Sequence, residues 1–560
     1  MKFFRKAAPV AMLATVALTL GACAQSERDT PTPGATNGGA AASGGTLTFG
    51  AAGAPKLFDP FYATDGETFR VTRQIFDGLL TLKPGTADLE PALATDMPTS
   101  TDGTTWEFKL RTGVKFSDGE PFNADAVCKN FERMFDQNAD AQKGPADYWS
   151  YTMGAFKDKA AESLYKGCEA KDEATAVISL NRVSSAWPAM LALPSFSMQS
   201  PKALTEGKAN DVKAQGEGFI YPAYSQAPVG TGPFKFEKYD QANGTVTLAR
   251  NADFWGDKAK VDKLVFKIVP DESTRRQELK AGSIQGYDLP NPVDWKGLED
   301  EGNQVLVRPA FNILYMGLNP EKNPKLKDLK VRQALYHALN REQLVQTQLP
   351  EGATVATQFM PDTVAGYNKS LQPYAYDVEK AKSLLKEAGA EGMTLNFAYP
   401  TEVSRPYMPN PQKIAEAIRT DLEAAGVKVK FTAKPWNGGY LDGIDAGSFD
   451  AWIIGWTGDY NAADNFIGTF FKGKTNDFHT YSQPWGQQLN DDLVAADSIP
   501  DEAQRTAAYE KLNQQIMEEY LPGLALTHSP PALVVGPDVE GIVASPMTAE
   551  EFNTASVGGK

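Results

Sequence analysis

Short runs in which hydrophobic and polar residues alternate recur along the chain, between longer stretches in which hydrophobic residues return every three or four positions. The runs KLVFKIV (263–269) and VKVKFTA (427–433) are typical of strands. The stretch KVRQALYHALNREQLVQ predicts one helix, because Val331, Leu335 and Leu339 fall on a single face. Strands alternating with amphipathic helices indicate the α/β class.

Two further helices carry signals at both ends. DVEKAKSLLKEAG begins with Asp377, whose side chain can cap the first turn, and ends at Gly389. NPQKIAEAIRTDLEAAG begins with Asn410 as the cap and Pro411 at the first helical position, and it ends at Gly426. We expect a helix between each pair of signals.

The N-terminus has the pattern of a signal peptide. A basic head, MKFFRK, precedes an apolar run over 7–20, which is too short to span a bilayer as a mature helix. The following LGAC resembles a bacterial lipobox, which implies removal of 1–22 and acylation of Cys23. Several acyl chains on one residue would anchor the protein stably. The alternative is a soluble secreted protein with an incidental cysteine.

Residues 23–45 are rich in Gly, Ala, Ser, Thr and Pro and have no apolar periodicity, which predicts a flexible tether. Ordered sequence is expected from about Thr46, where TLTFG supplies the first strand-like alternation. The roughly 500 residues that follow exceed what one core supports, so two or more lobes are expected. The formal net charge of −15 argues against nucleic acid as the main partner.

If Cys23 is lipidated, Cys128 and Cys168 are the two remaining cysteines. An even pair in an oxidising compartment suggests a disulfide, with two buried free thiols as the alternative.

One stretch is a literal match to a phosphate-binding loop: GTFFKGKT, residues 468–475. Two adjacent rings, Phe470 and Phe471, stand where the backbone would have to close around phosphates. Pro484 and Gly486 downstream argue against the long helix that such a loop requires. An exported protein also meets no ATP. We therefore expect no nucleotide site.

Signals of enzymatic chemistry are weak. The three histidines, His337, His479 and His528, are widely spaced and have no accompanying cysteine cluster. The sequence lacks a G-x-S-x-G motif and a recognisable arrangement of Ser, His and acid. We expect no metal, no cofactor and no enzymatic activity.

Four motifs, in the same order, resemble those of one family. They are WEFKLRTGVKFSDGEPFNADAV (106–127), GTGPFKFEKYD (230–240), DLKVRQALYHALNRE (328–342) and YDVEKAKSLLKEAG (376–389). The family that they resemble is the peptide- and nickel-binding family of ABC importer solute-binding proteins, extracellular solute-binding protein family 5.

This resemblance implies a two-lobed clamshell of the periplasmic-binding-protein type, with two crossovers between the lobes and an extra subdomain. Lobe I would comprise 46–310 and 530–560, with the subdomain at about 83–210. Lobe II would comprise 311–529. The ligand would be enclosed between the lobes by a hinge motion.

Two segments are similar to dipeptide-binding proteins: SRPYMPNPQKIAEAI and IIGWTGDYNAADNF. The resemblance implies that Arg405 holds the carboxylate of the peptide and that Asp459 holds its α-ammonium group. A guanidinium can grip a carboxylate through two parallel hydrogen bonds. A buried ionic group left without a partner is costly, so peptides capped at either end should be rejected. Taken alone, Arg405 could be a surface loop residue and Asp459 a turn residue.

Five further residues are weaker candidates for ligand contacts. Trp456 and Gly458 belong to the segment that contains Asp459, and Trp436 lies in KPWNGGY. The two tryptophans could instead be packing residues. Thr64 and Asp65, in the loop ATDGETF ahead of a helix, could contact the ligand from the other lobe.

The resemblance therefore implies a lipid-anchored, monomeric receptor at the outer face of the cytoplasmic membrane, or on the periplasmic side. It would capture short peptides, dipeptides above all, and deliver them to an ABC permease. Tyr460-Asn461-Ala462-Ala463 departs from the dipeptide-binding pattern, which leaves ligand length open. An oligopeptide, glutathione, haem or a metal chelate is the alternative ligand within the family. An exported peptidase is the alternative outside it.

Overall fold

The computed structural model describes residues 44–558 except 217 and 475. The predicted signal peptide, the lipidation site Cys23 and the tether up to residue 43 lie outside this part of the chain. The backbone N–H of Gly44, the first described residue, already donates to the carbonyl of Lys260, at 2.7 Å. Among the described residues, no helix combines the length and apolar character needed to cross a membrane.

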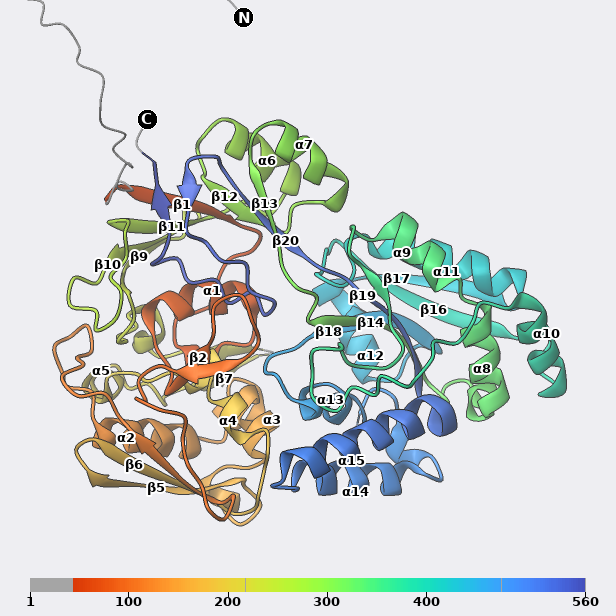
Figure 1. Ribbon diagram of the computed structural model, residues 1–560, viewed down its shortest axis with the longest axis horizontal. Coiled ribbons are helices and arrows are strands. Elements are labelled where there is room, and N and C mark those ends of the chain that lie inside the picture. The colour runs from red at the N-terminus through yellow and green to blue at the C-terminus, as the bar shows by residue number, and fades with distance from the viewer. Residues whose placement is uncertain (1–43, 217, 475, 559–560) are drawn as a thin grey trace, which may run out of the picture. The chain divides into compact units, whose positions relative to one another are not determined.

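The first sheet has seven strands and combines segments from both ends of the described chain (Figure 1). Its strand β1 (Thr46–Ala51) pairs in parallel with β11 and β12. Leu47 and Phe49 are buried at alternate positions of β1, as expected for a strand with one face on the core. The order is β13 (Gln304–Val307), β20 (Ala532–Val535), β12 (Gly286–Asp288), β1, β11 (Lys263–Ile268), β10 (Thr245–Arg250) and β9 (Phe234–Asp240).

The second sheet has six strands, in the order β15 (Thr354–Val355), β19 (Gly523–His528), β14 (Asn312–Leu318), β18 (Ala451–Thr457), β16 (Thr394–Thr401) and β17 (Lys428–Pro435). Strands β17, β16 and β18 are neighbours and run parallel to one another. All seven residues of β14 are buried, which fits a strand covered on both faces. The largest hydrophobic core surrounds this sheet.

The chain passes twice between these two sheets, at residues 308–311 and at residues 529–531. Asn312 and Ser529 tie the two crossovers together. The side-chain amide of Asn312 donates to the carbonyl of Ser529 at 2.7 Å and accepts from the Ser529 N–H at 3.1 Å. The two connections are therefore joined where they enter and leave the second sheet.

Arg308 lies on the first crossover and is fully buried. Its guanidinium donates to Glu550 and to Asp288, each at 2.6 Å. Its backbone N–H donates to the carbonyl of Pro531 on the second crossover, at 2.8 Å. Asp288 also forms an ion pair with Arg70. A buried network of charges therefore fixes both crossovers to the first sheet.

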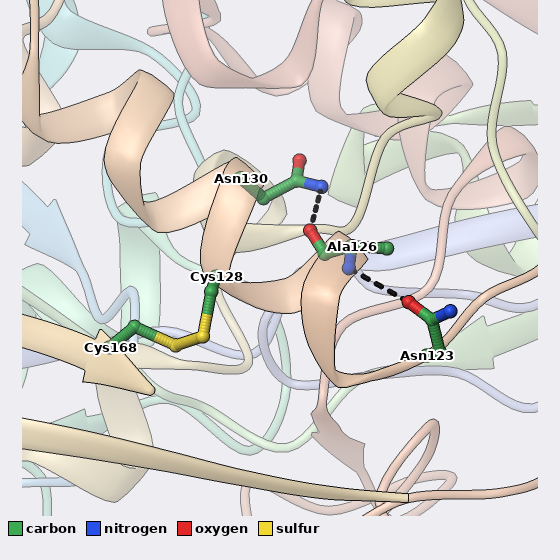
Figure 2. Close-up of a disulfide and its surroundings, with 5 residues drawn as sticks. All are labelled: Asn123, Ala126, Cys128, Asn130 and Cys168. Carbon is green, nitrogen blue, oxygen red and sulfur yellow. Dashed lines mark hydrogen bonds between the residues drawn. A yellow bond between two sulfur atoms is a disulfide. The ribbon is translucent and has the colours of Figure 1, made fainter. Parts of the chain in front are cut away.

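A third sheet has the order β4 (Thr105–Lys109), β6 (Thr175–Leu180) and β5 (Tyr165–Asp172). Helix α2 (Ala124–Phe135) is joined to β5 by a disulfide between Cys128 and Cys168, whose Cα atoms lie 5.2 Å apart (Figure 2). The side chain of Asn123 caps the start of α2 by accepting from the Ala126 N–H at 3.0 Å.

Two of the predicted helices form between their expected end signals. Helix α10 (Val378–Glu387) is capped by Asp377, which accepts from the Lys380 N–H at 2.9 Å. Helix α11 (Pro411–Ala424) is capped by Asn410, and Gly426 follows it with a φ of 88°. The caps satisfy backbone N–H groups that have no partner within a helix.

The single helix predicted for KVRQALYHALNREQLVQ is wrong, because two helices form there: α8 (Leu329–Ala338) and α9 (Arg341–Gln348). Leu339 is extended, and Asn340 caps α9. The Asn340 side chain accepts from the Gln343 N–H at 3.0 Å and donates to the Gln343 side chain at 3.1 Å. This side-chain cap starts a new helix inside a continuous hydrophobic period.

The remaining α-helices cover the sheets or lie in the connections between strands (Figure 1). They are α1 (Gly66–Ile75), α3 (Asp147–Met153), α4 (Trp187–Met190), α5 (Pro201–Glu206), α6 (Glu272–Lys280), α7 (Trp295–Asp300), α12 (Leu441–Asp445), α13 (Ile467–Phe471), α14 (Gly486–Asp497) and α15 (Glu502–Gln514). The short strand pairs are β2 (Leu80–Leu82) with β3 (Leu89–Pro91), β7 (Lys213–Gln215) with β8 (Gly218–Ile220), and β21 (Val539–Glu540) with β22 (Ser556–Val557).

Candidate ligand-binding site

Three of the predicted site residues follow the carboxyl ends of neighbouring parallel strands. Trp436 comes directly after β17, Arg405 after β16 and Asp459 after β18. Phe397 and Ala451 are paired between β16 and β18, and Arg405 and Asp459 each lie eight residues beyond their member of this pair. The carboxyl edge of parallel strands is where open α/β sheets bind ligands. The fold therefore directs an arginine and an aspartate to one edge of the second sheet.

The carboxylate of Asp459 is held in a largely dry environment. Tyr148 of α3 donates its hydroxyl to Oδ1 at 3.2 Å, and the buried Oδ2 has no partner among the described residues. Burial raises the pKa of Asp459 to about 7, although the Tyr148 hydrogen bond and the positive charge of Arg73 both act to lower it. A cationic partner would stabilise the ionised form of this carboxylate, because the loss of water is the main cost of carrying a charge in the buried site.

Arg405 stacks on Trp436. The guanidinium carbon lies 4.2 Å from the centroid of the Trp436 ring, which is a close cation–π arrangement. The Arg405 backbone forms a bridge with Met408, with hydrogen bonds of 3.1 and 2.9 Å. Its Nε is buried, and no acceptor for it lies in the described part of the chain. The side chain is thus half-buried and oriented by packing, with hydrogen-bonding capacity to spare.

The turn that carries Asp459 is organised by Asn465. The side-chain oxygen of Asn465 accepts from the Asp459 N–H at 2.7 Å and from the indole N–H of Trp456 at 3.3 Å. Gly458 is required by space, since a Cβ there would lie 2.2 Å from the ring of Phe311. Trp456 and Gly458 therefore support the turn that carries Asp459, Trp456 through its hydrogen bond to Asn465 and Gly458 by leaving room for the Phe311 ring.

The two candidates ahead of α1 have other surroundings. Asp65 caps the helix, because its carboxylate accepts from the Thr68 N–H at 3.0 Å and from the Thr68 hydroxyl at 2.7 Å. Thr64 is exposed, and within the described residues no hydrogen bond connects it with Asp459 or Arg405. Asp65 followed three residues later by Thr68 is a capping pattern that could have been read from the sequence.

Sequence reasoning missed Arg73 of α1 and Tyr148 of α3, which approach Asp459 from segments that precede the first crossover. Burial lowers the pKa of Arg73 to about 10, while the charges of Glu550 and Asp459 act to raise it. Tyr460, next to Asp459, is buried in the hydrophobic core of the third sheet. Arg73 is half-buried on α1, and no local signal in the sequence distinguished it.

The nucleotide-loop match does not form a loop. Residues 468–471 lie in helix α13, and Lys472 forms an ion pair with Asp464 at 2.5 Å. The backbone N–H groups of Phe470 and Lys472 donate to the carbonyls of Phe466 and Gly468 at 3.0 and 2.9 Å, so they are not free to surround a phosphate. Across the residues that the structure describes, no group of three or more His, Cys, Asp and Glu could hold a metal ion.

Two α/β sheets joined by two crossovers define the class of two-lobed clamshell binding proteins. The sequence model of the bacterial extracellular solute-binding proteins, family 5 (middle region), matches residues 88–478, and the chain belongs to this family.

Similar proteins bind different ligands. The chain is 34% identical to di/tripeptide-binding protein 1 of Pseudomonas aeruginosa, over 91% of this chain and 94% of that protein. It is 31% identical to heme-binding protein A of Haemophilus influenzae, over 98% of both chains. A solved dipeptide binding protein of Pseudoalteromonas sp. SM9913, in complex with Met-Leu, has a TM-score of 0.76 and 27% identity, over 92% of this chain and 100% of that one.

Proposed function

We propose that this protein captures short peptides, dipeptides above all, and delivers them to an ABC permease. The two main sheets are the cores of two lobes, with lobe I at 46–310 and 530–560, its subdomain at about 83–210, and lobe II at 311–529. Acylation of Cys23 anchors the protein to the membrane and leaves the lobes in the cell envelope. The protein acts as a monomer and performs no chemistry on its ligand.

The observation that carries this proposal is the position of Arg405 and Asp459, which both follow the carboxyl ends of neighbouring parallel strands. Neighbouring strands are about 4.8 Å apart, and an extended dipeptide is about 7 Å long. A zwitterion of that size can reach both groups at one sheet edge. The carboxylate of the peptide would accept from Arg405, and its ammonium group would donate to the buried, unpartnered oxygen of Asp459.

Haem is an alternative ligand, because one of the similar proteins is a heme-binding protein. The charges of Arg405 and Asp459 favour a peptide over haem. Haem carries two carboxylates and no ammonium group, so it would leave the Asp459 carboxylate without a cation in a buried site. An unpaired buried charge costs several kcal/mol. Specificity for a free amino terminus thus follows from the charge at Asp459.

Isothermal titration with an unmodified dipeptide tests the proposal. We expect Asp459→Asn and Arg405→Ala each to weaken binding by at least tenfold, about 1.4 kcal/mol, with the fold retained. Arg419→Ala is the matched control, since Arg419 also stacks on an aromatic ring, with its guanidinium carbon 4.6 Å from the Phe431 centroid. Asp300→Asn is a surface control. Unchanged affinity in both site variants would refute the site assignment.

A further inference from the structure

Asp497, the last residue of α14, forms hydrogen bonds with Ser185, which lies 312 positions away in the chain. Its Oδ1 accepts from the Ser185 hydroxyl at 2.8 Å, and from the N–H groups of Ser185 and Ala186 at 3.2 and 3.3 Å. Its backbone carbonyl also accepts from the Ser185 N–H, at 3.0 Å. Asp497 therefore holds both the backbone and a side chain of a distant segment.

This contact joins parts of the molecule that belong to different hydrophobic cores. Ala186 is buried in the core of the third sheet, and Ala496 is buried in the core that surrounds the second sheet. Asp497 lies between the two crossovers in the chain, whereas Ser185 lies before the first of them. The chain connects the two sides through the crossovers, so the Asp497 contact is an additional, non-covalent link between them.

The surroundings of the contact are open. A cavity of about 240 Å³ lies beside it, and its lining includes Asp497, Ser184, Tyr151 and Val494. Tyr151 and Val494 remain 43% and 45% exposed. A contact made of hydrogen bonds at the margin of a cavity can separate at low cost, because water replaces each partner when the two sides move apart.

A cation reduces the electrostatic cost of the contact. Lys472 forms an ion pair with Asp464 at 2.5 Å, and both residues line the same cavity as Asp497. Burial and the negative charge of Asp464 raise the pKa of Asp497, whereas the positive charge of Lys472 acts to lower it. Lys472 therefore makes it easier to keep the Asp497 carboxylate ionised while the two sides are in contact.

We propose that Asp497 is a latch, whose hydrogen bonds to Ser185 and Ala186 form when the two lobes close and break when they open. The latch stabilises the closed form through contacts between protein groups, outside the residues assigned to the ligand. This inference rests on the proposed arrangement of lobes, and it does not depend on which ligand the lobes enclose.

A latch of this kind affects ligand binding in a characteristic way. A ligand enters the open form and is retained by the closed form, so the apparent Kd rises when the closed form is less populated. Loss of the latch should raise the dissociation rate constant. The association rate constant should stay the same or increase, because entry takes place through the open form. Damage to the ligand site itself has no reason to spare association.

Stopped-flow fluorescence with Ala-Ala at pH 8 measures both rate constants. We expect Asp497→Ala to raise the dissociation rate constant about tenfold, because it removes an ionic acceptor of three hydrogen bonds. Ser185→Ala removes the hydroxyl donor alone and should raise it about threefold. In the double variant Ser185→Ala should add nothing, because its partner is already gone. Asp491→Ala is the matched control, since Asp491 is exposed on the same helix.

Equal dissociation rate constants in the wild type and Asp497→Ala would overturn the latch. Additive effects of the Asp497 and Ser185 substitutions, or an association rate constant that falls in Asp497→Ala, would also overturn it. Thermal unfolding checks that the variants are folded. If Asp497→Ala does not fold, Asp497→Asn replaces it, because it keeps the shape and removes the charge, and a threefold faster dissociation is then expected.

Hydrogen exchange tests the contact without any ligand. The Ala186 N–H, which donates to the Asp497 carboxylate, should exchange about tenfold faster in Asp497→Ala than in the wild type, with the amides of α2 as the internal standard. If Ala-Ala does not bind to the wild type, the proposed peptide function fails, and the exchange rate of Ala186 still decides on the latch. An unchanged exchange rate would overturn the latch alone.

Discussion

Peptide capture should depend steeply on pH, because binding an ammonium group requires an ionised Asp459. Burial raises the pKa of this carboxyl in the ligand-free protein from 3.8 to about 7, so the group is mostly neutral below pH 6. The ionised form is the one that the ligand needs. Affinity is therefore present above the raised pKa and is lost as the pH falls through it.

The size of the effect follows from two titrations. With a pKa of about 7, the ionised fraction of Asp459 falls from about 0.76 at pH 7.5 to about 0.03 at pH 5.5. The α-ammonium group of the free ligand, with a pKa of about 7.8, is about two-thirds charged at pH 7.5 and fully charged at pH 5.5. Together these fractions predict affinity about fifteenfold weaker at pH 5.5, with an optimum between about pH 7 and pH 8.

Isothermal titration at a series of pH values measures this dependence. Repeating the titration at pH 7 in two buffers of different ionisation enthalpy gives the net number of protons exchanged. We expect a net release of about 0.4 proton, because Asp459 loses about half a proton and the ligand amino group takes up about 0.1. Asp459→Asn is the control, and its weaker binding should be nearly flat between pH 5.5 and pH 7. A flat wild-type profile over that range, or an equally steep variant, would refute the reasoning.

Three stability predictions follow from packing and covalent structure. Gly458→Ala should lower the free energy of unfolding by about 1–3 kcal/mol and weaken peptide binding, because the added Cβ meets a ring at 2.2 Å; wild-type values in urea unfolding and titration would contradict this. Replacing Cys128 and Cys168 by serine should lower the free energy of unfolding by about 2–4 kcal/mol, since their disulfide links residues 40 positions apart in the chain. An unchanged melting temperature would disprove this. Arg308→Met should lower the free energy of unfolding by about 3–5 kcal/mol, because it removes a positive charge that compensates two buried carboxylates. A urea midpoint equal to that of the wild type would exclude this role.

The sequence predicted those helices whose two ends are set by local capping signals. Helices α10 and α11 form between their caps because Asp377 and Asn410 each satisfy a free N–H of the first turn. The break between α8 and α9 was missed because hydrophobic residues continue through it, while the deciding contact is a side-chain cap at Asn340. At this position the hydrophobic pattern predicts a continuous helix and the cap predicts a break, and the structure follows the cap.

The site could be predicted only in part, for a physical reason. The assignment of Arg405 and Asp459 comes from resemblance and stays a prediction, since neither residue is unusual in its local sequence. Tyr148 lies 311 positions from Asp459 in the chain, and only tertiary packing brings them together. Asp65 also caps helix α1, and its contact with the ligand stays a prediction.

The place of β20 in the first sheet affects how the protein can be made. This strand lies between β13 and β12 in the sheet, yet in the chain it follows both of them only after all the strands of the second sheet. A chain that emerges from its N-terminus onward therefore cannot complete its first sheet until β20 has been made. Until then β13 has no partner in the sheet and one edge of β12 stays open, so chaperone protection against mispairing is most valuable during that interval.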